Sequence, residues 1–177
     1  KQFLSSTGSA SYSQSGGLFI LRGRFLRTPV SYASISDLTD ATEATLSTMR
    51  TAVVGSNAHG SFNLENTTNI FSFSGGTIRI YDVTGTTANE AFDVKASTAN
   101  ISVTGGNLVI MPKSGPSGDA SYFAVHSTAP LWNMTVSRID GTAFARMSTA
   151  LTILNDLSLT TGALNANNLD LAVAGSF

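Results

Sequence analysis

The amino-acid sequence predicts an all-β fold, a right-handed parallel β-helix (β-solenoid) with rungs of about 30 residues. Three observations favour this fold: short segments alternate apolar with polar residues, a Gly-Gly step divides two such segments, and the whole arrangement recurs. Residues 71–81 read FSFSGGTIRIY and residues 101–111 read ISVTGGNLVIM, so Gly75-Gly76 in the first segment corresponds to Gly105-Gly106 in the second. We therefore expect a stack of similar rungs.

The alternation predicts which residues face the interior. Successive side chains of a strand point to opposite faces, so a period of two places one set inside and the other outside. In the two clearest copies Phe71 aligns with Ile101, and Ile80 aligns with Ile110. Stacked rungs would place these residues above one another in a continuous core, with each Gly-Gly step as a corner between short strands.

Two looser copies extend the repeat to about two periods on either side. Residues 12–21 place Gly17 in line with Gly76, and residues 157–164 place Gly162 in line with Gly106. Each rung is expected to hold three strands, at 71–74, 77–82 and 90–97 in one rung and at 100–104, 107–111 and 121–127 in the next. An antiparallel sandwich also uses short alternating strands and is the alternative fold.

Some segments depart from the repeat. Residues 25–60 are expected to be an insertion or decoration, and within them residues 36–50 form a short helix or an irregular excursion. Residues 112–119, PKSGPSGD, indicate an exposed loop. The chain is otherwise one β-solenoid segment, 1–177. Its last residues, LAVAGSF, continue a strand pattern without a polar cap, so we expect a fragment of a longer chain.

Composition excludes several classes of function. Charged residues make up 12% of the chain and the net charge is -1, so there is no basic surface for nucleic acid. No apolar run approaches the ~20 residues of a membrane-spanning helix, and no membrane insertion is expected. The chain has no cysteine, which excludes disulfides, zinc–thiolate sites and a cysteine nucleophile.

No residue is assigned a catalytic, cofactor-binding or metal-binding role, and the expectation is that the protein is not an enzyme. His59 and His126 are the only histidines, and both are interpreted as surface residues. The aspartates do not recur in pairs at the repeat period, as a sugar-cleaving site would require; those considered are Asp82, Asp93, Asp119, Asp140, Asp156 and Asp170. Calcium-binding nonapeptides are missing as well.

Several surface features are expected on the outer faces. Arg79 and Lys95 are placed there, where they could pair with Asp93 or Glu90 in surface ion pairs of little energetic weight. Two outward rows are expected, Ser72 over Ser102 and Ser74 over Thr104, and they are interpreted as solvated β-faces. An aromatic platform for carbohydrate would have to come from Tyr81, Tyr122 and Trp132.

The sequence resembles one protein family. Residues 130–138, PLWNMTVSR, and residues 150–177, ALTILNDLSLTTGALNANNLDLAVAGSF, are similar to the β-helical repeats of very large secreted cell-surface proteins of the Bacteroidota, including gliding-motility adhesins. The Ser/Thr-Gly-Gly steps fit the same family. The likeness covers most of residues 61–177 and part of 12–24, and residues 25–60 depart from it.

The resemblance implies an extracellular, cell-surface location and export by type IX secretion. It implies a non-enzymatic structural or adhesive segment of a surface filament, and it transfers no catalytic residue. Its partners would be adjoining rungs of the same longer chain, the secretion and outer-membrane machinery, and surface polysaccharide. The alternative is a carbohydrate-binding or polysaccharide-degrading β-helix domain, in which carboxylates and a basic residue would converge in one groove.

Overall fold

The computed structural model describes residues 11–21, 25–27, 62–64, 67–81, 90–111, 122–137 and 144–177. Within these ranges the regular structure is β-strand, apart from one turn of 3-10 helix (η1, Thr98–Asn100). The predicted excursion at 36–50 and the predicted loop at 112–119 lie outside the described residues. No described helix is long and apolar enough to cross a membrane.

The described strands form three sheets, and neighbouring strands within each sheet are parallel. The first sheet contains, in spatial order, β1 (Ser11–Leu21), β4 (Ile70–Tyr81), β6 (Ile101–Met111), β8 (Asn133–Val136) and β11 (Leu157–Leu159). The second contains β2 (Phe25–Arg27), β3 (Phe62–Leu64), β5 (Glu90–Val94), β7 (Tyr122–Ser127), β9 (Phe144–Met147) and β12 (Leu164–Asn165). The third contains β10 (Leu151–Ile153) and β13 (Leu171–Val173).

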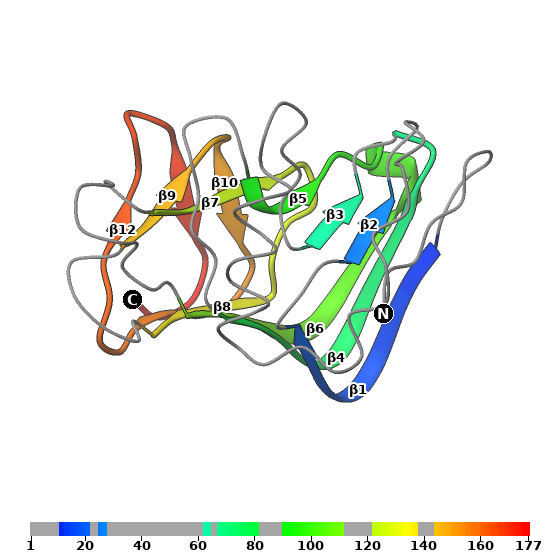
Figure 1. The fold of residues 1–177 in the computed structure, drawn as a ribbon, viewed down its shortest axis with the longest axis horizontal. Coiled ribbons are helices and arrows are strands. Elements are labelled where there is room, and N and C mark those ends of the chain that lie inside the picture. Colours follow the sequence, from blue (N-terminus) through cyan, green and yellow to red (C-terminus); the bar gives the residue numbers. More distant parts are fainter. Residues whose placement is uncertain are drawn as a thin grey trace, which may run out of the picture.

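Spatial order follows chain order in every sheet, so the strands advance along the long axis of the molecule from β1 to β13 (Figure 1). Each strand pairs with its counterpart from the next passage of the chain, and we call one such passage a rung. Parallel neighbours in one sheet cannot be joined by hairpins, because a hairpin reverses the strand direction. The described pairings therefore contradict the antiparallel sandwich.

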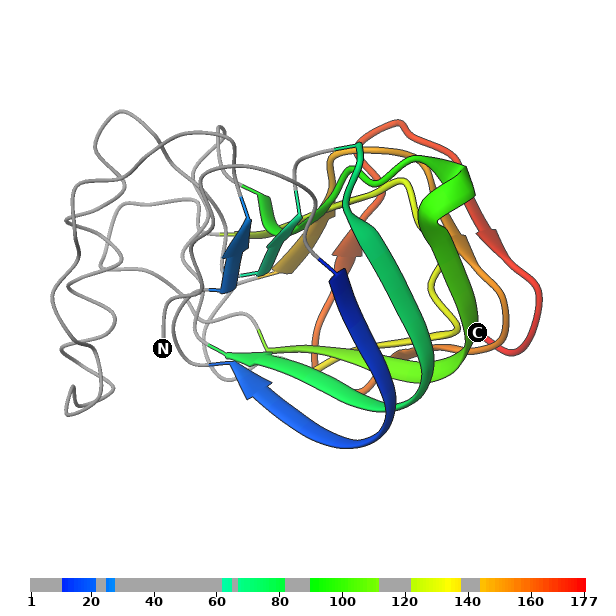
Figure 2. The ribbon, with the colours of Figure 1, turned by 90° about the vertical axis from the view of Figure 1, so that its right-hand side faces the viewer.

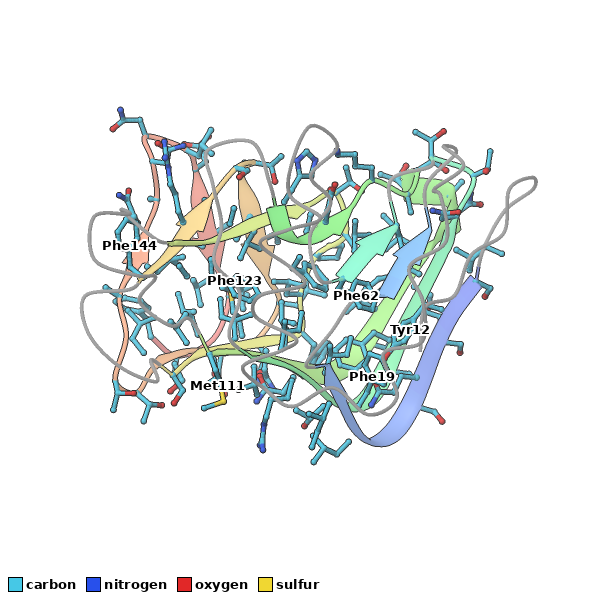
Figure 3. The ribbon with its side chains drawn as sticks, viewed as in Figure 1. Tyr12, Phe19, Phe62, Met111, Phe123 and Phe144 are labelled. Atoms are coloured by element: carbon cyan, nitrogen blue, oxygen red, sulfur yellow. The ribbon has the colours of Figure 1, made fainter. Side chains whose placement is uncertain are left out.

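The predicted register of the two clearest repeats is confirmed. Phe71 pairs with Ile101 and Ile80 with Ile110 across β4 and β6. Phe71, Ile80 and Ile110 are fully buried. Aromatic rings also stack in the core: the rings of Phe62 and Phe92 lie 5.1 Å apart between centroids, nearly parallel. Phe62 and Phe123 point into the space between the sheets (Figure 3).

The Gly-Gly step lies inside a strand instead of separating two strands, which corrects the expected division into 71–74 and 77–82. β4 and β6 each run through the step, and the register between them shifts there. The second glycine has positive φ, +82° at Gly76 and +98° at Gly106. A glycine adopts this conformation at no steric cost, so the strand can bend. Figure 2 shows the resulting curvature of β1, β4 and β6.

The repeat length is not constant along the first sheet. Tyr12 pairs with Phe71, and Phe71 pairs with Ile101, so the second step in residue number is about half of the first. Leu108 then pairs with Met134, and Met134 with Leu157, at successively shorter steps. The alignment of Gly162 with Gly106 is therefore wrong. Leu108, Met134 and Leu157 are successive register partners and form one column across the first sheet. Gly162 instead precedes β12, which belongs to another sheet.

Phe25–Arg27, the start of the predicted insertion at 25–60, forms β2 and pairs in parallel with β3. Beyond β2, the described residues resume at Phe62–Leu64 and again at Thr67. Residues 28–60 thus lie outside the described part.

Candidate functional site

An ion pair lies on the outer side of β5. Asp93 lies between the core residues Phe92 and Val94, so its side chain points to the opposite, outer side of the strand. The Nζ atom of Lys95 lies 3.0 Å from the Oδ2 atom of Asp93. The pairing of Lys95 with Asp93 was predicted, but the burial of Asp93 was not. Asp93 is only 1% exposed while Lys95 is 35% exposed, so the carboxylate is buried on the outer side of the sheet. Loss of Lys95 would leave a charge with little water around it, which is costly.

His126 is the register partner of Asp93 on β7. It lies on the outer side, next to the core residue Val125, and is partly buried. Asp93, Lys95 and His126 are therefore neighbours on one outer surface, a combination that the sequence did not predict. It offers one carboxylate and one ammonium group, whereas glycoside hydrolysis commonly uses two carboxyl groups flanking the bond.

The remaining aspartates are dispersed where they are described. Asp156 follows β10 and belongs to a corner described below, and Asp170 is exposed before β13. Asp82, Asp119, Asp140 and His59 lie outside the described residues. Among the described residues, no group of three or more His, Asp or Glu side chains could hold a metal ion.

The outward serine row is confirmed in part. Ser72 pairs with Ser102, and Ser13 of β1 pairs with Ser72, so the row crosses three strands. Ser74 pairs with Gly105 and not with Thr104, because the register shifts at the Gly-Gly step. The second expected row is therefore wrong.

Of the three residues of the expected aromatic platform, the structure describes the side chain of one. Trp132, which directly precedes β8, is partly buried. The side chains of Tyr81 and Tyr122 lie outside the described part of the structure.

A ladder of hydrogen bonds lies where the chain enters the first sheet; we call it the Asx ladder, made by the side chains of Asn133, Asn155 and Asp156 and the backbone N–H of Ser176. The Oδ1 atom of Asn133 accepts hydrogen bonds from the Asn155 side chain (2.9 Å) and the Asp156 backbone N–H (3.0 Å). On the next rung, Oδ1 of Asp156 accepts from the Ser176 backbone N–H (2.8 Å). Each rung thus supplies an acceptor for a backbone donor of the following rung.

Sequence reasoning missed the Asx ladder, because the interval between its members is shorter than the interval between the Gly-Gly steps. The separation in sequence is 23 between Asn133 and Asp156 and 20 between Asp156 and Ser176. A search at a constant period of 30 does not align them. The available signal was local: Asn or Asp directly before an apolar strand, as in Asn133-Met134 and Asp156-Leu157.

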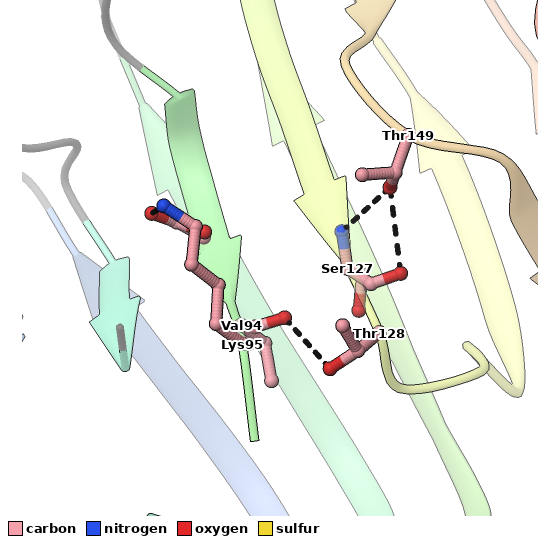
Figure 4. A network of polar contacts seen from close by, with 6 residues as sticks. Val94, Lys95, Ser127, Thr128 and Thr149 are labelled. Carbon is pink, nitrogen blue, oxygen red and sulfur yellow. Dashed lines mark hydrogen bonds and ion pairs between the residues drawn. The ribbon is translucent and has the colours of Figure 1, made fainter. Parts of the chain in front are cut away.

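Hydroxyl groups also link neighbouring rungs at the corner after the second sheet (Figure 4). The Oγ1 atom of Thr149 accepts a hydrogen bond from the Ser127 backbone N–H at 3.2 Å. Thr128 donates from Oγ1 to the backbone carbonyls of Val94 (3.1 Å) and Ala96 (2.7 Å) on the preceding rung. Buried backbone groups need partners where the strand ladder ends, and these side chains provide them. Both corners therefore serve rung-to-rung cohesion.

Comparisons with known proteins give no family to which the geometry can be assigned. No protein-family model, no curated protein and no solved structure matches this chain.

Proposed function

We propose that the chain is a right-handed parallel β-helix that serves as a structural, adhesive segment of an extracellular surface protein. The observation that carries the proposal is the recurrence of the same columns across rungs: apolar residues over apolar residues inside, and the Asx ladder at the corner. A right-handed connection is what parallel strands in one sheet almost always use. Such a stack suits a spacer that holds a binding surface away from a cell.

The architecture can be tested with engineered disulfides, because the chain has no cysteine of its own. Register partners on neighbouring strands lie about 4.8 Å apart, within the Cα separation that a disulfide spans. The double variant Ser72→Cys with Ser102→Cys should form an intramolecular disulfide on oxidation, measured by mass spectrometry. The control, Ser72→Cys with Ser158→Cys, places the thiols on β4 and β11 and should remain reduced. An unbridged Ser72/Ser102 pair would contradict the stack.

The surface location has its own experiment. Antibodies raised against the folded domain should label intact cells that produce the protein, and treatment of those cells with an external protease should remove the label. Labelling that appears only after the cells are permeabilised would contradict an extracellular role.

We propose the outward serine row, Ser13, Ser72 and Ser102, as the surface that contacts polysaccharide. Hydroxyl groups at the regular spacing of a parallel sheet offer repeated donors and acceptors to a sugar chain. A triple variant with glutamate at these positions should lose retention on immobilised polysaccharides. The control carries glutamate at the exposed positions Thr152, Ser158 and Thr160 and should be retained. Equal retention of both variants would reject this surface.

A further inference from the structure

A single arginine lies on the outer face of the first sheet. Arg79 is the only charged residue in the five described strands of this sheet, whereas strands of the second sheet contain charged residues of both signs. It lies between Ile78 and Ile80, which are fully buried, so its side chain points to the outer side. Because β4 has β1 on one side and β6 on the other, this position is not at an end of the described stack.

The structure places Arg79 away from the acids that were expected to pair with it. Asp93 and Glu90 belong to β5 of the second sheet, and Asp93 pairs with Lys95 instead. Within the described ranges Arg79 forms no ion pair, and its Nε atom is buried without a hydrogen-bond partner. The residue as a whole is partly exposed. Arg79 therefore offers a positive charge that no described carboxylate balances and that a ligand can reach.

The neighbours of Arg79 on this face combine aliphatic and hydrogen-bonding side chains. Its register partners are Ile20 on β1 and Val109 on β6, and Ile20 is 47% exposed. Thr77 lies two residues before Arg79 and thus on the same face, and its register partner on β6 is Asn107. Thr77 and Asn107 are both partly exposed. A cation, an aliphatic surface, a hydroxyl and an amide therefore occupy adjacent positions of one face.

These groups match the parts of an acidic sugar. A guanidinium presents its N–H donors in a planar fork that fits the two oxygens of a carboxylate. Hydroxyl and amide groups exchange hydrogen bonds with sugar hydroxyls, and exposed aliphatic side chains gain from covering the C–H groups of a sugar ring. An acidic peptide would also satisfy Arg79, but the outward serine row on the same strands adds hydroxyl groups that suit repeated sugar units.

We propose that the polysaccharide bound by the outer face of the first sheet is acidic, and that Arg79 holds a uronate carboxylate of this polymer beside Ile20 and Thr77. The inference rests on the polysaccharide contact proposed above and specifies the chemical class of the polymer. The argument for this occupant is charge complementarity, because the described strands of the sheet carry one positive charge and no negative charge. A neutral polymer would leave that charge without a counterpart.

The test compares two polymers that differ only in charge: polygalacturonate, and the same polymer after its carboxyl groups have been reduced to alcohols. The wild-type protein should bind polygalacturonate about two- to fivefold more tightly, the range expected for one exposed ion pair. The preference should be largest in about 0.01 M salt and disappear in about 1 M salt, because salt screens exposed charges. Isothermal titration measures the two dissociation constants.

Three variants assign the preference to a residue. Arg79→Gln removes the charge and should abolish the preference for polygalacturonate. Arg79→Lys keeps the charge but loses the fork geometry, so it should retain part of the preference. The control, Arg146→Gln, removes the same charge from β9 in the second sheet and should retain the preference in full.

Three results would overturn the proposal. One is equal affinity of the wild-type protein for the two polymers, and another is an undiminished preference in Arg79→Gln. The third is binding of poly-L-glutamate that is as tight as that of polygalacturonate and depends equally on Arg79, since the ligand would then be an acidic peptide.

The neutral polymer separates this inference from the serine row on which it rests. If glutamate at Ser13, Ser72 and Ser102 leaves binding of the neutral polymer unchanged, the serine row is rejected while the preference due to Arg79 stands. If the wild-type protein binds both polymers equally, the polysaccharide contact stands and the acidic class is rejected. A wild-type protein that binds neither polymer rejects both.

Discussion

At the scale of single residues, the glycine steps combine two separate constraints. Gly17 and Gly76 both have positive φ, but only Gly76 is crowded. A Cβ atom at Gly76 would lie 2.5 Å from the carbonyl carbon of Gly16 on the neighbouring strand, whereas one at Gly17 would meet no described atom within 4 Å. The Gly-Gly pair thus permits both the bend and the close approach of neighbouring rungs.

Alanine substitutions separate the two constraints. Gly16→Ala should change the free energy of unfolding little, because that site is open and has no positive φ. Gly17→Ala should cost about 1–2 kcal/mol from the backbone conformation alone. Gly76→Ala should cost more than Gly17→Ala, because backbone atoms must also move. Urea denaturation of the three variants measures the order, and equal losses at Gly17 and Gly76 would show that crowding is unimportant.

Tyr12 gives a prediction about pH. Burial raises the pKa of its phenol above the ordinary value of 10.0. Above pH 10 the unfolded chain therefore ionises Tyr12 while the folded chain keeps it neutral, and the free energy of unfolding falls. The contribution to stability is complete below pH 10 and declines as the pH rises. Tyr12→Phe should show a shallower decline between pH 9 and 11 in urea denaturation; an identical slope would contradict burial of the phenol.

At the scale of structural elements, the Asx ladder ties the corners together. Asn133→Ala removes the acceptor of the Asp156 backbone N–H and of the Asn155 amide. The bond to the Asp156 N–H lies at an exposed position, so its loss should cost about 0.5–1.5 kcal/mol, the net contribution of an ordinary hydrogen bond. Thermal unfolding should therefore occur at a lower temperature for this variant, with Thr152→Ala, at an exposed position of β10, as the control. Equal unfolding temperatures for Asn133→Ala and Thr152→Ala would mean that water replaces the hydrogen bonds of the Asx ladder.

The elements also show what the sequence could and could not predict. The register of β4 with β6 followed from alternation and from the Gly-Gly step, because both patterns are local and repeat at one interval. The corner at Asn133 did not follow, because rung length changes along the chain. Burial of Asp93 did not follow either: alternation places a side chain on the outer side of a sheet but does not reveal what covers it.

At the scale of the whole molecule, the core is continuous from rung to rung. The loss in the free energy of unfolding when a core side chain is shortened should therefore depend on where that side chain lies along the axis. Leu151 and Leu171 are the same residue type in the same column. Leu151→Ala should lower the free energy of unfolding by about 2–5 kcal/mol, as expected in a packed core. Leu171→Ala, in the last described rung, should cost less, because its side chain is already partly exposed.

Urea denaturation of this matched pair measures the difference directly. Equal losses for the two variants would mean that the end of the stack is as well packed as its interior. A larger loss at Leu171 would reverse the expected gradient.

The alignment of strand pairing with the long axis has a mechanical consequence. Because neighbouring strands of each sheet succeed one another along that axis, a tension applied between the two ends loads the strand pairs one after another. The chain should then peel away in steps, and release of roughly 20–30 residues lengthens it by roughly 70–100 Å. Force spectroscopy should record a series of small ruptures, each with a lengthening in this range, instead of one large rupture. The domain would behave under load as an extensible tether.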